Sequence, residues 1–491
     1  MSPSVYISKP PGSLFKFPPD NEPQALPPAV AGSSLSAPPF SISPSLYNAV
    51  LDVKVPITIA CVYAASVTAL NAYNRSRGNK PWRISQTKAF FWFVVAHNIL
   101  LAVYSGWTFI GMWDALRESV VSPLGAGGIA ATVDSLCKIQ GPRGLGNAVA
   151  YNSTTSSWIS QSPSSVFLTA AGTPAPTDQG RLWNQGLAFY GWFFYLSKFY
   201  EVLDTVIILA KGKRSSTLQT YHHAGAMMSM WSGMRYMSPP IWMFVFVNSG
   251  IHALMYTYYT LTAFSVPIPQ ALKRSLTTMQ IIQFLVGASY AAIHSFVSYE
   301  IPVKVPVVKA AFQAATSVAS SVVSSATDVA HNATIVDMIK KLIFRALGEE
   351  GLAGNVDPKT TSIPSAPITG SDGISYETQY QTVPCIDTSG QTFAIWFNVF
   401  YLTPLTFLFV RFFVKSYLRR GSKSVKKSTL AIENGRAING HAGTPSKRAT
   451  LKATPNGTPN GTPNGKANGT PNGKAKINGH ANGNANGKAK H

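Results

Sequence analysis

The chain has 491 residues, of which 46% are hydrophobic and 11% aromatic. Only 12% are charged, whereas soluble globular domains average about 25%. So little charged surface disfavours a set of solvated domains and favours a protein whose surface faces lipid. Three cysteines exclude a disulfide-rich secreted scaffold, and the apolar content excludes disorder over most of the length.

The formal net charge of +22 is concentrated at one end of the chain. Residues 415–491 carry fifteen Lys and Arg against a single acid, Glu433. From Thr454 onward this region repeats Thr-Pro-Asn-Gly and Gly-Lys units, a composition that buries too little apolar surface to fold. We therefore predict a disordered basic tail at 421–491 that lies near anionic phospholipid headgroups and does not bind nucleic acid.

The Pro-rich residues 1–45 show no apolar periodicity and no leader with a cleavage site, so we predict a disordered N-terminus without a signal peptide. After it come about seven apolar segments, each close to the roughly 20 residues that cross a bilayer as a helix. The sequence thus predicts an all-α membrane protein with seven transmembrane helices. The segments are Val55–Tyr73, Ala89–Trp113, Gly186–Leu209, Leu218–Tyr236, Ile241–Phe264, Leu276–Tyr299 and Phe393–Val414.

Basic residues predict the orientation, because the cytoplasmic flanks of membrane helices are enriched in Lys and Arg. The first, third and fifth loops are basic and contain no acid, whereas the second has four bases and four acids and the sixth has six bases and nine acids. We therefore predict a lumenal N-terminus, a cytosolic C-terminus and lumenal inserts at about 114–181 and 300–391. The basic residues are Arg75, Arg77, Lys80, Arg83 and Lys88, then Lys211, Lys213 and Arg214, then Lys273 and Arg274.

The predicted lumenal inserts contain further signals. Asn152 and Asn332 begin N-glycosylation sequons, one in each insert. Cys137 and Cys385 also lie one in each insert, and an oxidising lumen allows them to pair. We hypothesise this disulfide, with two free thiols as the alternative, because Cα spacing cannot be read from sequence. The segment Val307–Leu347 is rich in Ala, Val and Ser and predicts a peripheral helix; if it crossed the bilayer, the tail would be lumenal.

Polar side chains recur on four of the predicted transmembrane helices. A charged side chain at a helix centre costs about 2.5 to 3.5 kcal/mol in a bilayer, so its presence indicates function. Spacings of three and four residues share one helix face, so four polar faces indicate a common polar interior. The stripes are Lys198, Glu201, Asp204 and Thr205; Gln219, His222 and His223; Asn248, His252, Tyr256 and Tyr259; and Thr277, Gln280 and Gln283.

Structural roles are the alternative for several of these residues. Lys198 and Glu201 fit an ordinary i,i+3 ion pair, and a lone His252 fits a satisfied interior histidine. Gln280 and Gln283 fit interhelical hydrogen-bond partners.

The tandem His222-His223 is harder to explain structurally. Adjacent imidazoles project about 100 degrees apart on a helix, so the pair together lines a site. His97 and His294 do not belong to a polar stripe on their own segments, and we assign them structural roles.

The combined set suits acyl-group chemistry. An imidazole acts as base, acid or nucleophile near neutral pH, carboxylates orient it, and amides stabilise an oxyanion. Such a polar group at the end of a hydrocarbon cavity suits a lipid substrate. We expect the basic residues of the cytoplasmic loops to bind phosphates, such as those of coenzyme A, with a role as topology determinants alone as the alternative. These residues are Lys211, Lys213, Arg214, Lys273 and Arg274.

Four sequence motifs on these segments resemble those of the ELO family of fatty-acyl elongases. They occur in order within 198–283, which makes the match specific, and the resemblance extends more loosely over a domain at 46–420. Lys198 to Thr205 resembles KxxExxDT, Thr220 to His223 the end of the HxxHH box, Asn248 to Tyr259 NxxxHxxMYxYY, and Thr277 to Gln283 TxxQxxQ.

The resemblance implies a seven-helix endoplasmic reticulum protein enclosing an acyl-chain tunnel. It implies that an acyl-CoA condenses with malonyl-CoA to give 3-oxoacyl-CoA, carbon dioxide and coenzyme A, with no cofactor and no metal. Partners would be the bilayer, other elongation-cycle enzymes and a second copy in a homodimer. The expected catalytic residues are His222 or His223 as reactive imidazole, by a covalent or a base mechanism, oriented by Glu201, Asp204 and His252. The expected substrate-binding residues are Lys198, Asn248, Tyr256, Gln280 and Gln283.

One residue departs from the family pattern. Gln219 stands where the box begins with histidine, which resembles fungal-type members that extend polyunsaturated chains.

Two other classes compete with this interpretation. A membrane di-iron desaturase resembles the His222-His223 pair but needs about eight histidine ligands by family pattern, and four of the nine histidines here lie in loops or the tail. A seven-helix receptor or transporter is the non-enzymatic alternative.

Overall fold

The computed structural model describes residues 3–28, 38–161, 168–307, 368–369 and 375–418. All of them belong to one compact unit, Met1–Val425. The predicted C-terminal tail at 421–491, the predicted helix Val307–Leu347 beyond its first residue, and the sequon at Asn332 lie outside the described residues.

Helices occupy all seven predicted segments. Four of them, α2, α3, α10 and α13 with its extension to Leu418, are long and apolar enough to cross a membrane. The sixth ends earlier than predicted, at His294, because the chain turns into a strand at Val297. The helices are α2 (Lys54–Ser76), α3 (Lys88–Ser119), α5 (Ala188–Tyr200), α6 (Val202–Ala210), α7 (Thr217–Arg235), α9 (Ser249–Ala263), α10 (Gln270–His294) and α13 (Ser389–Phe413).

Shorter helices complete these segments. The third segment starts with a π-helical turn, the fifth has α8 and a π-helical turn before α9, and the last ends in one. Three further short helices precede or connect the segments. The π-helical turns are Trp183–Leu187, Phe244–Asn248 and Val414–Leu418, and α8 is Ile241–Met243. The three further short helices are α1 (Pro44–Val50), the 3-10 turn Arg83–Gln86 and α4 (Gly128–Cys137).

Local sequence determines where several helices begin. The hydroxyls of Thr87, Ser216 and Thr388 each accept a hydrogen bond from the backbone N–H three residues later, at the start of α3, α7 and α13. Such caps satisfy donors that have no partner within the helix. At the basic loop, Ser216 therefore fixes the start of α7, less than two turns before His222.

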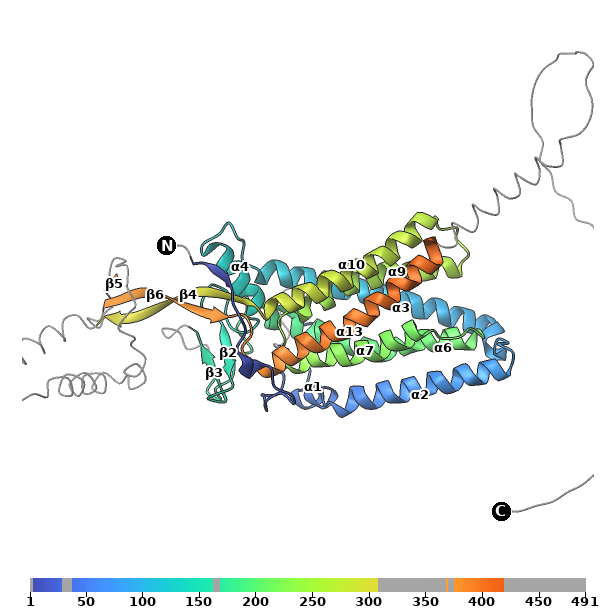
Figure 1. Ribbon diagram of the computed structural model, residues 1–491, viewed down its shortest axis with the longest axis horizontal. Helices are drawn as coiled ribbons and strands as arrows, with labels where there is room; N and C mark the ends of the chain where they lie inside the picture. Colours follow the sequence, from blue (N-terminus) through green and yellow to red (C-terminus); the bar gives the residue numbers. More distant parts are fainter. Residues whose placement is uncertain (1–2, 29–37, 162–167, 308–367, 370–374, 419–491) are drawn as a thin grey trace, which may run out of the picture. The chain divides into compact units, whose positions relative to one another are not determined.

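The long helices form a closed series of neighbours. Helix α3 contacts α9, α9 contacts α10, α10 contacts α13, α13 contacts α7, α7 contacts α5, and α5 contacts α3. Helix α2 packs outside this ring against α6 and α7. Several of these helices are seen side by side in Figure 1. Polar groups on the inner faces of all six ring helices can therefore meet.

The apolar side chains divide between two environments. A buried cluster forms around α5, where Trp183, Phe189, Tyr190, Trp192 and Tyr195 pack together with residues of α3 and α7. Large apolar side chains elsewhere are exposed, among them Trp92, Leu100 and Ile110 on α3 and Phe400 and Phe407 on α13. Exposed apolar faces on long helices suit contact with lipid hydrocarbon.

The prediction of an all-α protein is wrong for the inserts. A four-stranded antiparallel sheet has the order β1-β4-β6-β5, and a hairpin pairs β2 with β3. In β4 the apolar side chains of Tyr299 and Ile301 are buried two residues apart, a period of two that is typical of strands. The strands are β1 (Val5–Ile7), β2 (Val149–Asn152), β3 (Ser157–Ser160), β4 (Val297–Val307), β5 (Ile368–Thr369) and β6 (Ser375–Pro384).

The N-terminus also differs from the predicted disorder at 1–45. Strand β1 pairs with β4, a 3-10 turn forms at Gly12–Leu14, and Glu22 and Ala25 are buried. The Glu22 carboxylate accepts a hydrogen bond from the Gly390 N–H at 2.5 Å. The composition did not reveal this order because the stabilising partners come from the far end of the chain.

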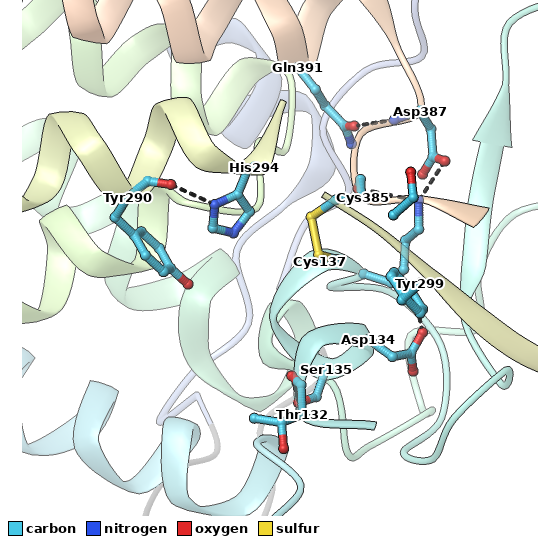
Figure 2. The surroundings of a disulfide bond; sticks show 12 residues. Thr132, Asp134, Ser135, Cys137, Tyr290, His294, Tyr299, Cys385, Asp387 and Gln391 are labelled. Carbon is cyan, nitrogen blue, oxygen red and sulfur yellow. Dashed lines mark hydrogen bonds and ion pairs between the residues drawn. A yellow bond between two sulfur atoms is a disulfide. The ribbon is translucent and has the colours of Figure 1, made fainter. Parts of the chain in front are cut away.

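A disulfide joins the two inserts. The sulfurs of Cys137, at the end of α4, and Cys385, after β6, are 2.02 Å apart, and Cys61 is free. Figure 2 shows Asp134 and Tyr299 beside the disulfide; the Tyr299 hydroxyl donates to the Asp134 carboxylate at 2.7 Å. This end of the molecule is thus tied together covalently.

Buried ion pairs add to that connection. Arg181 pairs with Asp134 at 2.6 Å, and Lys138 with Asp387 at 2.5 Å. Burial raises the pKa of Asp387, and the Lys138 ammonium opposes that shift. His294 lies within 4.8 Å of the two sulfurs, but sulfurs bonded to each other supply no thiolate ligand.

Candidate active site

A buried ion pair lies where α5 gives way to α6. The Lys198 ammonium donates to the Glu201 carboxylate at 2.7 Å, and both side chains are at most 4% exposed. Lys198 also lies 4.0 Å from the centroid of the Phe194 ring. The second carboxylate oxygen of Glu201 is buried and has no hydrogen-bond partner among the residues that the structure describes. A buried oxygen without a hydrogen bond costs free energy of folding. This oxygen can therefore accept a proton or a further hydrogen bond.

The predicted histidines gather near this carboxylate. The Nδ1 atom of His252, on α9, lies 3.7 Å from Glu201 Oε1. On α7, the rings of His222 and His223 are 5.4 Å apart, and the charges of Lys198 and Glu201 act on both. Three helices thus bring together the imidazoles and the carboxylate that the sequence pattern assigned to one site.

The two neighbouring histidines have different partners. Gln219, one turn earlier on α7, lies with its amide nitrogen 2.7 Å from His223 Nε2. The His222 Nδ1 atom instead lies 3.0 Å from the hydroxyl of Tyr401 on α13. Gln219 therefore keeps a hydrogen-bonding role at the position where the motif departs from the family pattern.

Asp204 has hydrogen-bond partners of its own, different from those of Glu201. Its carboxylate lies 2.9 Å from His97 Nε2 on α3 and accepts a 2.6 Å hydrogen bond from the Tyr256 hydroxyl on α9. The polar residues of this one stripe thus belong to two groups of side chains. Lys198 and Glu201 are in the first, and Asp204 is in the second. Next to it, the Thr205 and Tyr63 hydroxyls are 2.8 Å apart.

The predicted amide residues form their own contacts. The Asn248 amide donates to Gln283 Oε1 at 3.2 Å, and both line a small pocket with Phe284. The Phe284 ring is 6.3 Å from that of His222, so one lining residue of this pocket lies next to the histidines. Gln280 is directed to the sulfur of Met255 at 3.4 Å.

The basic residues Lys211, Lys213 and Arg214 are exposed in the loop between α6 and α7. Partial burial and the neighbouring Lys213 lower the pKa of Lys211. The loop ends at Ser216, less than two helical turns before His222, so its charges lie at the same end of α7 as the imidazoles.

Two residues of the site were not found from the sequence. His97 was assigned a structural role because its own helix offered no polar stripe, and its partner Asp204 lies on another helix. Tyr401 received no role, although Asn398 and Tyr401 are buried and three residues apart on α13, a short stripe that would have pointed to it.

The fold and the site together define a class: a helical membrane protein whose ring of helices encloses imidazoles, carboxylates and amides. Residues 48–425 match the family described as ELO, GNS1/SUR4. The chain therefore belongs to the ELO family, and it is a multi-pass membrane protein.

Curated relatives carry elongase names. The chain is 38% identical over 105 residues to very long chain fatty acid elongase 3 of Homo sapiens, which covers 21% of this chain and 39% of the human protein. It is 31% identical over 123 residues to fatty acid elongase 2 of Trypanosoma brucei brucei, and this match covers 25% of this chain and 45% of the trypanosome protein. The matched residues of this chain thus span less than half the length of each of these relatives. No solved structure matches.

Proposed function

We propose that this protein is the condensing enzyme of fatty acid elongation. It joins a long-chain acyl-CoA to malonyl-CoA and releases carbon dioxide and coenzyme A. The observation that carries the proposal is the buried contact of Glu201 with Lys198 and His252, with His222 and His223 beside it. The elongase names of the relatives support the same chemistry.

The residues supply what the reaction needs. In the covalent route an imidazole nitrogen attacks the acyl thioester, and the coenzyme A thiolate leaves and takes a proton. Malonyl-CoA then loses carbon dioxide, and the resulting enolate attacks the acyl-imidazole and releases the histidine. In the base route an imidazole promotes the loss of carbon dioxide from malonyl-CoA, and the enolate attacks the acyl thioester directly and expels the coenzyme A thiolate, which takes a proton. In both routes Asn248 and Gln283 are suited to stabilise the oxyanion, while Glu201, with His252, orients the imidazoles.

The proposal extends to the membrane topology, the compartment, the substrates and the partners of the protein. Seven spans in the endoplasmic reticulum membrane would enclose a tunnel for the acyl chain and leave the C-terminus cytosolic. Lys211, Lys213 and Arg214 would then bind coenzyme A phosphates at the cytosolic surface, and Gln219 would go with polyunsaturated substrates. A homodimer and other enzymes of the elongation cycle are the proposed partners.

Product analysis tests the proposal. Membranes containing the protein are supplied with malonyl-CoA and a panel of acyl-CoAs, and 3-oxoacyl-CoA and carbon dioxide are measured. We expect both products only when an acyl-CoA is present. His222→Ala and His223→Ala should each lower the rate by about 100-fold or more, as removal of an acid–base group does.

His294→Gln is the matched control, because His294 is buried on α10 and its ring hydrogen-bonds to the backbone of Tyr290 and Leu136. It should retain the rate. Purified protein that contains stoichiometric iron, or that forms no 3-oxoacyl-CoA with any acyl-CoA, would contradict the proposal.

A further inference from the structure

Tyr401 reaches across from α13 to the histidine pair. It is 9% exposed, and its hydroxyl makes two hydrogen bonds to a single residue of α7. The hydroxyl donates to the backbone carbonyl of His222 at 3.0 Å. The same oxygen lies 3.0 Å from the Nδ1 atom of the His222 ring.

The single proton of a tyrosine hydroxyl decides the direction of both bonds. A carbonyl oxygen only accepts hydrogen bonds, so the hydroxyl proton must point to the His222 carbonyl. The tyrosine oxygen is then the acceptor for the ring, and Nδ1 must carry the proton. In a neutral imidazole one nitrogen donates and the other accepts, so the Nε2 lone pair of His222 is left free.

We propose that Tyr401 is a positioning residue that holds His222 in its Nδ1–H tautomer and thereby presents Nε2 as the reactive atom. This inference rests on the proposed condensation and specifies which nitrogen performs it. His223 is less suited to that role, because its Nε2 atom is bonded to Gln219.

Two neighbours on α7 hold Tyr401 in place. A Cβ atom at Gly225 would lie 2.1 Å from the Tyr401 ring, so only glycine allows the ring to lie against the helix there. Tyr221 stacks on Tyr401, with ring centroids 5.7 Å apart, and its hydroxyl donates to the Tyr401 backbone carbonyl at 3.1 Å. Three residues of α7 around one helical turn thus contact the same tyrosine.

Spectroscopy of the substrate-free protein tests the tautomer directly. The full chain is labelled with 15N-histidine, and His222 is assigned by the signals that disappear in His222→Asn. Protonated and unprotonated ring nitrogens differ in 15N shift, so we expect Nδ1 protonated and Nε2 unprotonated. The opposite assignment would overturn the inference even if the protein condenses its substrates.

Kinetics of Tyr401→Phe test the consequence. The variant keeps the ring and removes the hydroxyl. Loss of one hydrogen bond of about 0.5 to 1.5 kcal/mol corresponds to a kcat about 2- to 13-fold lower, and the KM for both substrates should stay the same. The His222 signals should change to a mixture of tautomers. An unchanged kcat, or a single Nδ1–H signal in the variant, would overturn the positioning role.

Two further variants separate this role from folding and from the proposed function. Tyr195→Phe removes another buried hydroxyl, one that donates to the Val50 carbonyl, and it should leave kcat and the His222 signals unchanged. Gly225→Ala keeps the Tyr401 hydroxyl but displaces the ring, so it should reproduce the Tyr401→Phe spectrum. If the wild type forms no 3-oxoacyl-CoA, the proposed function fails, whereas the spectrum still decides the tautomer.

Discussion

Asp204 connects three helices through one carboxylate. His97 on α3 and Tyr256 on α9 both bond to it, and the His97 and Asp204 side chains are 0% and 17% exposed. The Tyr256 ring in turn lies 5.7 Å from that of His252, so we assign Asp204 to the assembly of the helices around the site, acting through Tyr256 and His97.

Replacement of Asp204 tests that assignment. Asp204→Ala leaves the His97 N–H and the Tyr256 hydroxyl without an acceptor, and each stranded buried group costs about 1 to 3 kcal/mol. We expect a lower unfolding temperature in detergent. Asp114→Ala, at a half-buried carboxylate on α3, is the control and should change stability by less than about 0.5 kcal/mol. Equal unfolding temperatures for the two variants would contradict the role.

Helices α3 and α5 approach closely because of one glycine. A Cβ atom at Gly111 would lie 2.1 Å from the ring of Tyr190, which is buried. At Gly106, five residues earlier on α3, such a Cβ would have no atom of the described part of the chain within 4 Å. The same substitution at the two positions therefore separates packing from helix propensity.

Gly111→Ala should destabilise the protein by about 1 to 3 kcal/mol, the usual cost of overpacking a core. Gly106→Ala should be neutral or stabilise it by up to about 1 kcal/mol, since alanine favours a helix over glycine. Thermal unfolding of the two variants measures both effects. If Gly111→Ala were as stable as Gly106→Ala, the close contact of α3 with α5 would be contradicted.

The strands and α4 gather at one end of the helices (Figure 1). The disulfide belongs to this end, because Cys137 ends α4 and Cys385 follows β6. The sequon at Asn152 belongs to this end, where β2 ends before the turn to β3. The Asn152 side-chain oxygen accepts a hydrogen bond from the Thr154 N–H at 2.8 Å. An oxidising compartment at this end would expose Asn152 to the glycosylation machinery.

We therefore expect endoglycosidase to lower the mass of the protein expressed in eukaryotic membranes. Asn152→Gln should remove the mass of one glycan on gel analysis. Asn147→Gln, which changes an asparagine outside any sequon, should have no effect. A wild type whose mass does not depend on Asn152 would contradict the predicted orientation of this end.

The sequence by itself determined the helices and the residue types of the site. Apolar length, the caps at Thr87, Ser216 and Thr388, and polar spacings of three and four are local properties, and the four motifs lie on single segments. The tertiary structure decided which polar groups meet. Only packing brings His97 to Asp204 and Tyr401 to His222, because each pair is separated by more than 100 residues. The order of residues 3–28 was decided in the same way, since β1 is stabilised by pairing with β4.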